Sequence, residues 1–244
     1  MISFLSPVNE QMRAMFPSET HPNRVIERAI LEQLGLERLG PDAAVLDIGC
    51  GRTAPNLSGL IGKAGKLYGI DVIDFTVGDV RLHLFKNDVR DMKDIPSNSV
   101  DLAYSRAVME HLENPELAYA EIARVLKPGG VYVFTTPSIY DYGSIAALLI
   151  PNRFHAKIVS ATEGRAGEDV FPTVFGSNSR RAITRQAAEV GLDIDHFAYI
   201  GQYPSYLVFN RVLFWLGSIY QKAIEKFTLT QPLQGWIFCT LKKP

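Results

Sequence analysis

Short apolar runs alternate with amphipathic stretches between residues 44 and 135. Helical spacing of apolar residues predicts an amphipathic helix, and a short apolar run between turn residues predicts a buried strand. The expected strands are 44–48, 67–70, 100–104 and 131–135, and the expected helices are 54–62 and 115–127. Repeated strand–helix units predict a parallel sheet with helices on both faces.

One further strand has a different pattern. Apolar and polar residues alternate over residues 80–84, which predicts a strand with one solvated face and therefore a place at the sheet edge. Only ten residues separate Asp71 from Leu82. Ten residues are near the lower limit for a crossover, so any helix there would have one or two turns. Farther on, Pro128-Gly129-Gly130 is expected to end the helix over 115–127, with glycine as a left-handed cap.

The pattern is interrupted after residue 137 and resumes near residue 178. The last predicted elements are a helix over 178–190, capped by Asn178 or Ser179, and strands over 192–200 and 235–241. We therefore expect a single domain over 1–244 with insertions at 138–177 and 202–230 that form a substrate cap or a contact with a membrane or partner. Residues 1–40 are expected to form an arm followed by an amphipathic helix at 24–39.

Composition narrows the function classes. Hydrophobic residues make up 47% of the 244 residues, and the formal net charge is -1, so a general nucleic-acid binder is disfavoured. Two cysteines far apart cannot build a four-thiolate zinc site. The first residues lack a basic start and a long apolar run, so we expect a cytoplasmic protein without a secretory signal, with any membrane contact peripheral.

The most informative segment is a glycine-rich turn between a strand and a helix. Gly49 and Gly51 would let a ligand approach exposed backbone N–H groups. With Ala54 they also satisfy a dinucleotide pattern, so the glycines alone do not identify the ligand. The third position is Thr53, for which we expect an ordinary φ and a role as the helix N-cap.

Two carboxylates distinguish between the possible ligands. Asp47 precedes the glycines and would repel a pyrophosphate, but it would attract an ammonium or sulfonium group. Asp71, twenty residues after Gly51, could accept hydrogen bonds from two ribose hydroxyls. A nucleoside with a cationic tail fits this pattern, and S-adenosylmethionine is such a molecule. The alternative role for Asp47 is a partner of the following helix dipole.

These motifs resemble class I S-adenosylmethionine-dependent methyltransferases of the small-molecule type 11 kind. The resemblance covers about residues 41–138 and includes NDVRDMKDIPSNSVDLAYSRAVMEHL at 87–112 and ARVLKPGGVYVFTTP at 123–137. It implies an α/β fold with a doubly wound seven-stranded sheet of order 3-2-1-4-5-7-6. Strand 7 would be antiparallel, with the insertions after strand 5 and between strands 6 and 7.

The resemblance also implies a set of cofactor-binding residues. The methionine part would lie against the first turn and the carboxyl end of strand four, and the nucleoside would lie against the ends of strands two and three. Arg106 would meet the cofactor's carboxylate, Asp71 the ribose, and Asp88 the adenine amino group. The full set is Asp47, Gly49, Cys50, Gly51, Asp71, Val72, Asp88, Val89, Ser105 and Arg106.

Methyl transfer needs an acceptor held in line with the methyl group, and a base only if the acceptor must lose a proton. Glu110 and His111 follow strand four, and His111 is the candidate base; local packing is its alternative role. His155 is a further catalytic candidate in the insertion. No metal is expected, because the position where related quinone-pathway enzymes carry another glutamate is Ala107.

The segment 204–227 is apolar and aromatic for about four helical turns, with Arg211, Lys222 and Lys226 interspersed. Three interpretations stay open. The helix is buried against the sheet or against a partner chain, as in a homodimer. It is a lid over an apolar substrate, or it lies in a membrane surface. The last two favour a hydrophobic or lipid-linked acceptor.

The leading hypothesis is therefore an enzyme that transfers a methyl group from S-adenosylmethionine to a small or lipid-linked acceptor, at oxygen. One alternative is a non-catalytic cofactor-binding partner subunit. Another is an NAD(P)-dependent oxidoreductase, which Asp47 disfavours. A nucleic-acid methyltransferase is disfavoured because strand four ends in YSRA (104–107) rather than in a Pro-Pro-aromatic sequence.

Overall fold

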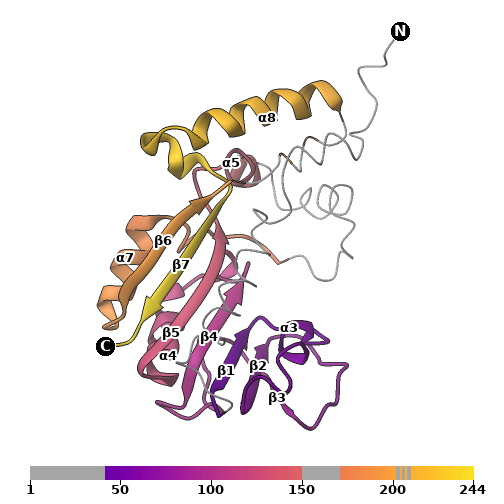
Figure 1. Ribbon diagram of the computed structural model, residues 1–244, viewed down its shortest axis with the longest axis vertical. Helices are drawn as coiled ribbons and strands as arrows, with labels where there is room; N and C mark the ends of the chain where they lie inside the picture. The colour runs from indigo at the N-terminus through magenta and orange to yellow at the C-terminus, as the bar shows by residue number, and fades with distance from the viewer. Residues whose placement is uncertain (1–41, 150–170, 202–203, 205–206, 208–209) are drawn as a thin grey trace.

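A computed structural model describes residues 42–149, 171–201, 204, 207 and 210–244. The predicted helix at 24–39 and the candidate His155 lie outside the described residues. One twisted sheet runs through the molecule, and α8 (Arg211–Glu225) lies across one end of it, beside α5 (Tyr142–Leu149) (Figure 1).

The sheet has seven strands in the order β3-β2-β1-β4-β5-β7-β6. The first five strands pair in parallel, and β7 runs antiparallel to both β5 and β6. The strands are β1 (Ala44–Ile48), β2 (Lys66–Asp71), β3 (Leu82–Lys86), β4 (Val100–Arg106), β5 (Leu126–Pro137), β6 (Asp193–Ile200) and β7 (Trp236–Lys242). The predicted fold class, strand order and antiparallel strand are confirmed.

The edge strand and the short connection before it also match the prediction. β3 forms hydrogen bonds with β2 alone among the described strands, and residues 72–81 contain no helix. Val80 lies outside the strand and is almost fully exposed. The alternation over 80–84 therefore correctly predicted an edge strand. The strand begins at Leu82, two residues after Val80, the first apolar residue of the alternating pattern.

Both faces of the sheet are covered. Leu46 and Ile48 on β1 pack into a cluster with α4 (Pro115–Val125) and α7 (Arg180–Glu189). Val45, pointing to the other face, packs with Leu57 of α3 (Pro55–Ser58). Because β1 is buried on both faces, all its residues are apolar except Asp47.

The helix after the glycine turn differs from its prediction. α3 spans four residues rather than nine, and its N-cap is Ala54, with φ 41° and no side-chain cap hydrogen bond. The expected cap role of Thr53 is therefore wrong, whereas its expected ordinary φ is confirmed, because Thr53 is absent from the positive-φ residues. The residue with left-handed backbone is Ala54, which is fully buried.

The Pro-Gly-Gly sequence at 128–130 was expected to cap α4, but α4 ends at Val125 and the next residue is already extended. β5 begins at Leu126, and residues 128–130 lie within it, where its register to β4 shifts. Gly129 has φ 80°, so its left-handed backbone allows a bulge in the strand and does not end a helix.

The C-terminal elements follow the prediction more closely. Ser179 is the N-cap of α7, and its Oγ accepts a hydrogen bond from the Ala182 N–H at 3.2 Å. α8 is followed by the short 3-10 helix η5 (Thr228–Leu233), which leads into β7. Among the described residues, no helix is long and apolar enough to cross a membrane.

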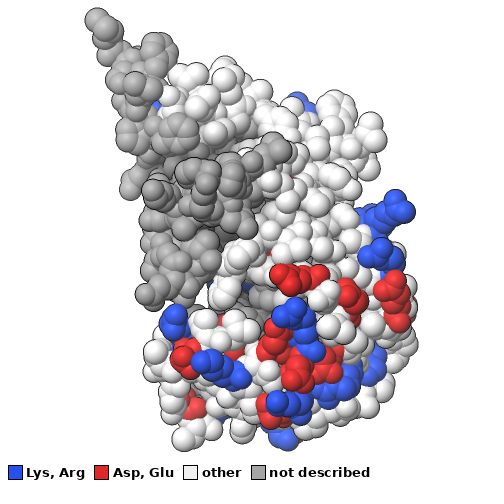
Figure 2. All heavy atoms as spheres, turned by 180° about the vertical axis from the view of Figure 1, so that it is seen from behind, with Lys and Arg blue, Asp and Glu red and all other residues white. Residues whose placement is uncertain are grey.

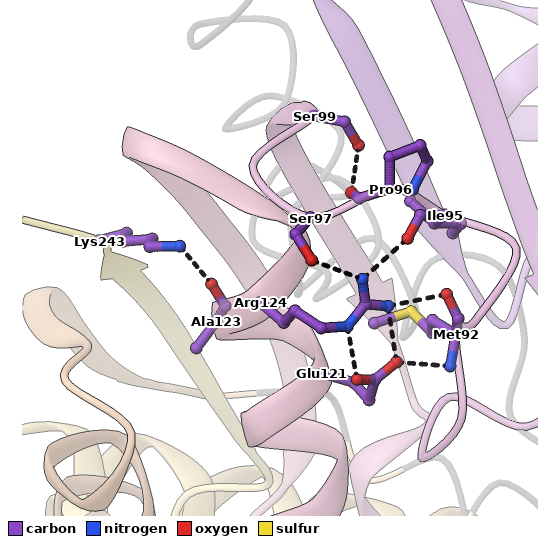
Figure 3. Close-up of polar contacts among 9 residues, drawn as sticks. All are labelled: Met92, Ile95, Pro96, Ser97, Ser99, Glu121, Ala123, Arg124 and Lys243. Atoms are coloured by element: carbon purple, nitrogen blue, oxygen red, sulfur yellow. Dashed lines mark hydrogen bonds and ion pairs between the residues drawn. The ribbon is translucent and has the colours of Figure 1, made fainter.

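Arg124, on α4, holds the loop between β3 and β4 (Figure 3). Its Nε and one terminal nitrogen donate to Glu121 at 2.7 and 2.8 Å, and its terminal nitrogens also reach the carbonyls of Met92 and Ile95 at 2.8 and 2.9 Å. The Ser97 hydroxyl accepts the fifth hydrogen bond. All five guanidinium donors are therefore satisfied, and the loop that follows Asp88 is tied to α4.

Candidate functional site

A pocket of about 590 Å³ opens at the carboxyl ends of the first parallel strands. Strand order reverses between β1 and β4, and open α/β sheets bind ligands at that kind of position. The predicted residues that line it are Gly49, Gly51, Asp71, Val72, Asp88, Val89, Arg106 and His111. The structure thus brings together eight candidates from separate parts of the chain.

The glycine turn forms one wall of the pocket. Gly49 and Gly51 have φ values of 74° and 75°, a region that favours glycine. A Cβ on Gly49 would collide with the Val108 side chain, whereas a Cβ on Gly51 would have no atom within 4 Å. Gly49 is therefore required for packing, and Gly51 leaves open space for a ligand.

Asp71 links the end of β2 to the glycine turn. One carboxylate oxygen accepts from the Gly51 N–H at 2.8 Å, and the other accepts from the Ile73 N–H at 3.3 Å. Each carboxylate oxygen can accept a second hydrogen bond, and Asp71 lines the pocket. This carboxylate can therefore both fix the turn and accept from a pair of neighbouring hydroxyls.

Asp47 is buried behind the turn rather than on the pocket wall. Its side chain is almost inaccessible, and its Oδ2 has no hydrogen-bond partner among the described residues. Burial raises its pKa to about 7, while Tyr104 and Arg106 act in the opposite direction. A buried carboxyl group with one oxygen that lacks a hydrogen bond fits a ligand that carries positive charge, as S-adenosylmethionine does, because such a ligand would favour its ionised form.

Asp88 lies in the pocket wall but already has a strong partner. Arg90 donates to both its carboxylate oxygens, at 2.9 and 2.7 Å, and its backbone N–H adds a third hydrogen bond at 2.8 Å. The Arg90 hydrogen bond lowers the pKa of Asp88. An adenine amino group would have to share this carboxylate with Arg90, which also lines the pocket and was not among the predicted residues.

Three other predicted residues do not line the pocket. The Ser105 hydroxyl is fully buried and lies 2.6 Å from the Tyr132 hydroxyl. Cys50 is buried, and burial raises its thiol pKa above its ordinary value. Glu110 is also buried, with one carboxylate oxygen accepting from Thr136 Oγ1 at 3.1 Å. These residues lie behind the wall, and a role for them would be to support its shape.

His111, at the end of the short 3-10 helix η2 (Met109–His111), lines the pocket. Its Nδ1 lies 2.9 Å from the Pro172 carbonyl, which can only accept, so in this hydrogen bond Nδ1 carries the proton. In the neutral ring Nε2 then has a free lone pair, and it lies 3.9 Å from Glu110 Oε1. This arrangement suits a proton acceptor whose charged form a carboxylate would stabilise.

Two residues behind His111 were not predicted as part of the site. Asn178 Nδ2 donates to Thr136 Oγ1 at 2.7 Å, and Thr136 Oγ1 in turn donates to Glu110. The sequence suggested Asn178 only as a helix cap, a role that Ser179 fills instead. No spacing in the sequence links positions 110, 136 and 178, because they come from η2, β5 and the segment before α7 and meet only in the folded chain.

The described residues hold no group of three or more His, Cys, Asp or Glu side chains that could bind a metal. The expectation that no metal is used stays a prediction. His155 lies outside the described residues, so its catalytic role also stays a prediction.

Residues 46–134 match the sequence profile of a family described as a methyltransferase domain. A sterol 24-C-methyltransferase from Gibberella zeae is 30% identical over 128 residues, covering 47% of this chain and 33% of the relative. A ubiquinone biosynthesis O-methyltransferase from Azoarcus sp. is 29% identical over 101 residues, covering 38% of this chain and 43% of the relative. This chain spans about a third to a half of the length of the first curated relatives.

A solved structure extends the fold comparison over nearly the whole chain. The geranyl diphosphate C-methyltransferase from Streptomyces coelicolor A3(2), solved with S-adenosyl-L-homocysteine, superposes with a TM-score of 0.53 at 17% identity. The match covers 98% of this chain and 90% of that chain. At this identity the likeness supports the fold, including the part of the chain beyond residue 134.

Proposed function

We propose that this chain, whose residues 46–134 match a methyltransferase-domain family, is a class I S-adenosylmethionine-dependent methyltransferase that methylates an apolar small-molecule or lipid-linked acceptor at a hydroxyl oxygen. The cofactor expected from the sequence is the one this family uses. When bound, it supplies an electrophilic methyl group on a positively charged sulfur. The remaining tasks fall to the chain: holding both molecules, excluding water and accepting a proton.

The observation that carries the proposal is a pocket wall formed by Gly49 and Gly51, with one carboxylate on the wall and another buried behind it. Asp71 lines the pocket and can accept from ribose hydroxyls, while Asp47 lies buried behind the turn with an Oδ2 that has no hydrogen-bond partner among the described residues. Arg106, at the end of β4, lines the same pocket and could pair with a carboxylate on the ligand. A dinucleotide pyrophosphate would meet Asp47 as a repulsive charge, which disfavours the oxidoreductase alternative.

His111 is the proposed base. Its Nε2 would take the proton of the acceptor hydroxyl, and Glu110 would stabilise the resulting imidazolium across 3.9 Å. The His111 side chain is 27% exposed, so the proton can pass to solvent afterwards. Thr136 and Asn178 would hold Glu110 in place through the hydrogen bonds described above.

The part of the pocket near His111 is apolar. Val108, Leu112 and Phe171 line it, and the rings of His111 and Phe171 lie 6.0 Å apart. A hydrocarbon acceptor would bury its surface against these side chains. Sterols and geranyl diphosphate, named in the relatives described above, are rich in hydrocarbon and support an acceptor of this class.

A carbon acceptor is the second candidate, because the sterol and geranyl diphosphate relatives are named as C-methyltransferases. Methylation of an alkene carbon forms a carbocation, which must lose a proton, so His111 could serve the same purpose there. Incubating cell lipid extracts and aqueous extracts with isotopically labelled methyl donor would test both. A labelled methyl ether supports oxygen and a labelled C–CH₃ product supports carbon.

Calorimetry with S-adenosylhomocysteine tests cofactor binding separately. Binding without labelled product from any extract would support the alternative of a non-catalytic partner subunit. No heat with either S-adenosylmethionine or S-adenosylhomocysteine would contradict the proposal.

Replacing the base tests the mechanism. His111→Ala is expected to lower turnover about a hundredfold, within the usual contribution of a general base, with cofactor affinity unchanged. His83→Ala on the edge strand, whose ring packs on Tyr68 away from the pocket lining, is the matched control. Full turnover in His111→Ala would exclude this histidine as the base.

A further inference from the structure

Helix α8 buries two polar residues and exposes most of its large apolar side chains. Its buried positions fall at helical spacing and are Phe214, Ser218, Gln221 and Ile224. Its outward apolar side chains are between 37% and 53% exposed and are Val212, Leu213, Trp215, Leu216, Ile219 and Tyr220. Two of the four buried residues are polar, so the outward side of this helix is about as apolar as its buried side.

Local contacts hold the helix at both ends. The Asn210 side chain caps the helix by accepting from the N–H groups of Val212 and Leu213, and the Ser218 hydroxyl donates to the Phe214 carbonyl at 2.7 Å. At the other end the Thr230 hydroxyl donates to the Ile224 carbonyl at 2.7 Å. These contacts define where the helix begins and ends, and its buried positions show which face points inward.

The apolar surface continues beyond the helix. Phe227 and Leu229 follow α8, and Leu229 is 92% exposed. Ile145 and Leu148 on α5 are also exposed, and α5 meets α8 where the rings of Tyr142 and Tyr220 lie 6.2 Å apart. We call these outward residues of α8, α5 and 227–229 the α8 surface. It lies at the end of the molecule opposite β3 (Figure 1).

Charge is distributed unevenly between the two ends. Figure 2 shows Lys, Arg, Asp and Glu side chains gathered over the half of the molecule away from α8, with few at the α8 end. Within 210–227 the charged residues are Arg211, Lys222 and Lys226 against a single Glu225. Glu225 accepts a hydrogen bond from Gln221 at 3.0 Å. The rim of the α8 surface is thus basic.

We propose that the α8 surface docks on a lipid bilayer that contains anionic headgroups. An amphipathic helix with Trp and Leu on one face and basic residues beside it lies in the bilayer interface, where the apolar face enters the acyl boundary and the cations meet phosphate. A bilayer offers hydrocarbon for the apolar side chains and negative charge for Arg211, Lys222 and Lys226. A protein partner would need a matching acidic rim, and a second copy of this chain would bring the same cations.

The inference does not require methyl transfer, so its test uses no turnover. Full-length protein is sedimented with vesicles of phosphatidylcholine alone and of phosphatidylcholine mixed equally with phosphatidylglycerol. Binding to the mixed vesicles is expected to exceed binding to the neutral ones by about tenfold and to fall with added salt. Protein that stays in the supernatant with both compositions would overturn the proposal.

A matched pair of variants locates the surface. Leu216 on α8 and Leu117 on α4 are equally exposed, at 50% and 51%. Leu216→Glu is expected to lower vesicle binding by about tenfold, and Leu117→Glu to leave it unchanged. Equal binding by both variants would overturn the assignment to α8. Thermal unfolding and S-adenosylhomocysteine binding of Leu216→Glu check that this variant is folded.

Tryptophan fluorescence gives a second measurement. The chain has two tryptophans, and Trp236→Phe leaves Trp215 as the reporter on α8. Its emission is expected to shift to shorter wavelength on mixed vesicles and to be quenched by brominated acyl chains. No shift, together with a dimer that Leu216→Glu dissociates in size-exclusion chromatography, would assign the surface to a second copy and overturn the membrane proposal.

Discussion

The pocket and the α8 surface each reverse the usual distribution of polar and apolar groups, but in opposite ways. Behind the glycine turn of the pocket a carboxylate, Asp47, is buried, and among the described residues its Oδ2 has no hydrogen-bond partner. On α8, leucines and a tryptophan are exposed while Ser218 and Gln221 are buried. A buried polar group or an exposed apolar patch is more informative than ordinary burial, because each costs free energy unless something binds there.

The two regions differ in the kind of binding partner that would stabilise them. Asp47 needs one charge at one place, and its effect should depend on pH. The α8 surface needs an area of hydrocarbon, and its response should depend on lipid composition and salt. A buried polar oxygen without a hydrogen bond therefore indicates a small ligand, and an exposed apolar surface indicates a membrane.

The largest expected contrast lies within α8 itself. Phe214→Ala should lower the free energy of unfolding by about 3–5 kcal/mol, because Phe214 is fully buried. Leu216→Gln, two residues away, should change it by less than about 0.5 kcal/mol. Urea denaturation measures both. A large loss in Leu216→Gln would mean that the outward face is covered within the folded chain, and the comparison would fail.

Arg124→Ala should be the next largest effect. It removes five hydrogen bonds that hold the loop after Asp88, and about 2–3 kcal/mol of unfolding free energy should be lost. Arg124→Lys keeps the charge but not the planar fork, and should recover only part of it. Cofactor affinity should also fall in Arg124→Ala, because the loop supports the pocket. If calorimetry shows unchanged affinity, the loop keeps its conformation without the Arg124 side chain.

Asp71→Ala should weaken S-adenosylhomocysteine binding by about tenfold or more, through loss of charge-assisted hydrogen bonds to the ribose. The control is Asp74→Ala, because Asp74 is an exposed carboxylate paired with Lys86 at 2.6 Å and does not line the pocket. Titration calorimetry at one pH compares the two. Equal affinity in both variants would remove the proposed ribose contact.

Asp47→Asn gives the smallest and most specific effect. Since burial raises the pKa of Asp47 to about 7, the folded chain without ligand should lose stability as pH rises from about 4 through 7. Binding of S-adenosylmethionine should instead strengthen over the upper part of that range, because the ionised carboxylate attracts its positive charge. Asp47→Asn should flatten both profiles and weaken binding about three- to tenfold at pH 8. Tighter binding by the variant would contradict the electrostatic role.

The sequence predicted the parts of the fold that depend on local patterns. Buried runs such as 44–48 and the paired glycines are set by periodicity and backbone freedom, and they were found where expected. The alternation over 80–84 predicted the edge strand, which begins at Leu82. The strand order came from the family resemblance rather than from any local pattern, and the structure confirms it.

The unpredicted features depend on tertiary contacts. Ser105 was expected in the pocket, but its hydroxyl is buried in the core, where it forms a hydrogen bond with the Tyr132 hydroxyl on the adjacent strand. Arg124 looked like an ordinary charged residue of a helix, because nothing in its neighbourhood reports the loop carbonyls it contacts. Thr53 was assigned the cap because threonine suits it, while the left-handed conformation fell on Ala54.

The position of β7 between β5 and β6 constrains the order in which the sheet can assemble during synthesis. Among the described strands β6 pairs only with β7, so when β6 leaves the ribosome the edge it will join does not yet exist. β5 is likewise left with one open edge until residues 236–242 emerge and close it. A nascent chain stalled before that point would expose two strand edges, and chaperone capture should be strongest there.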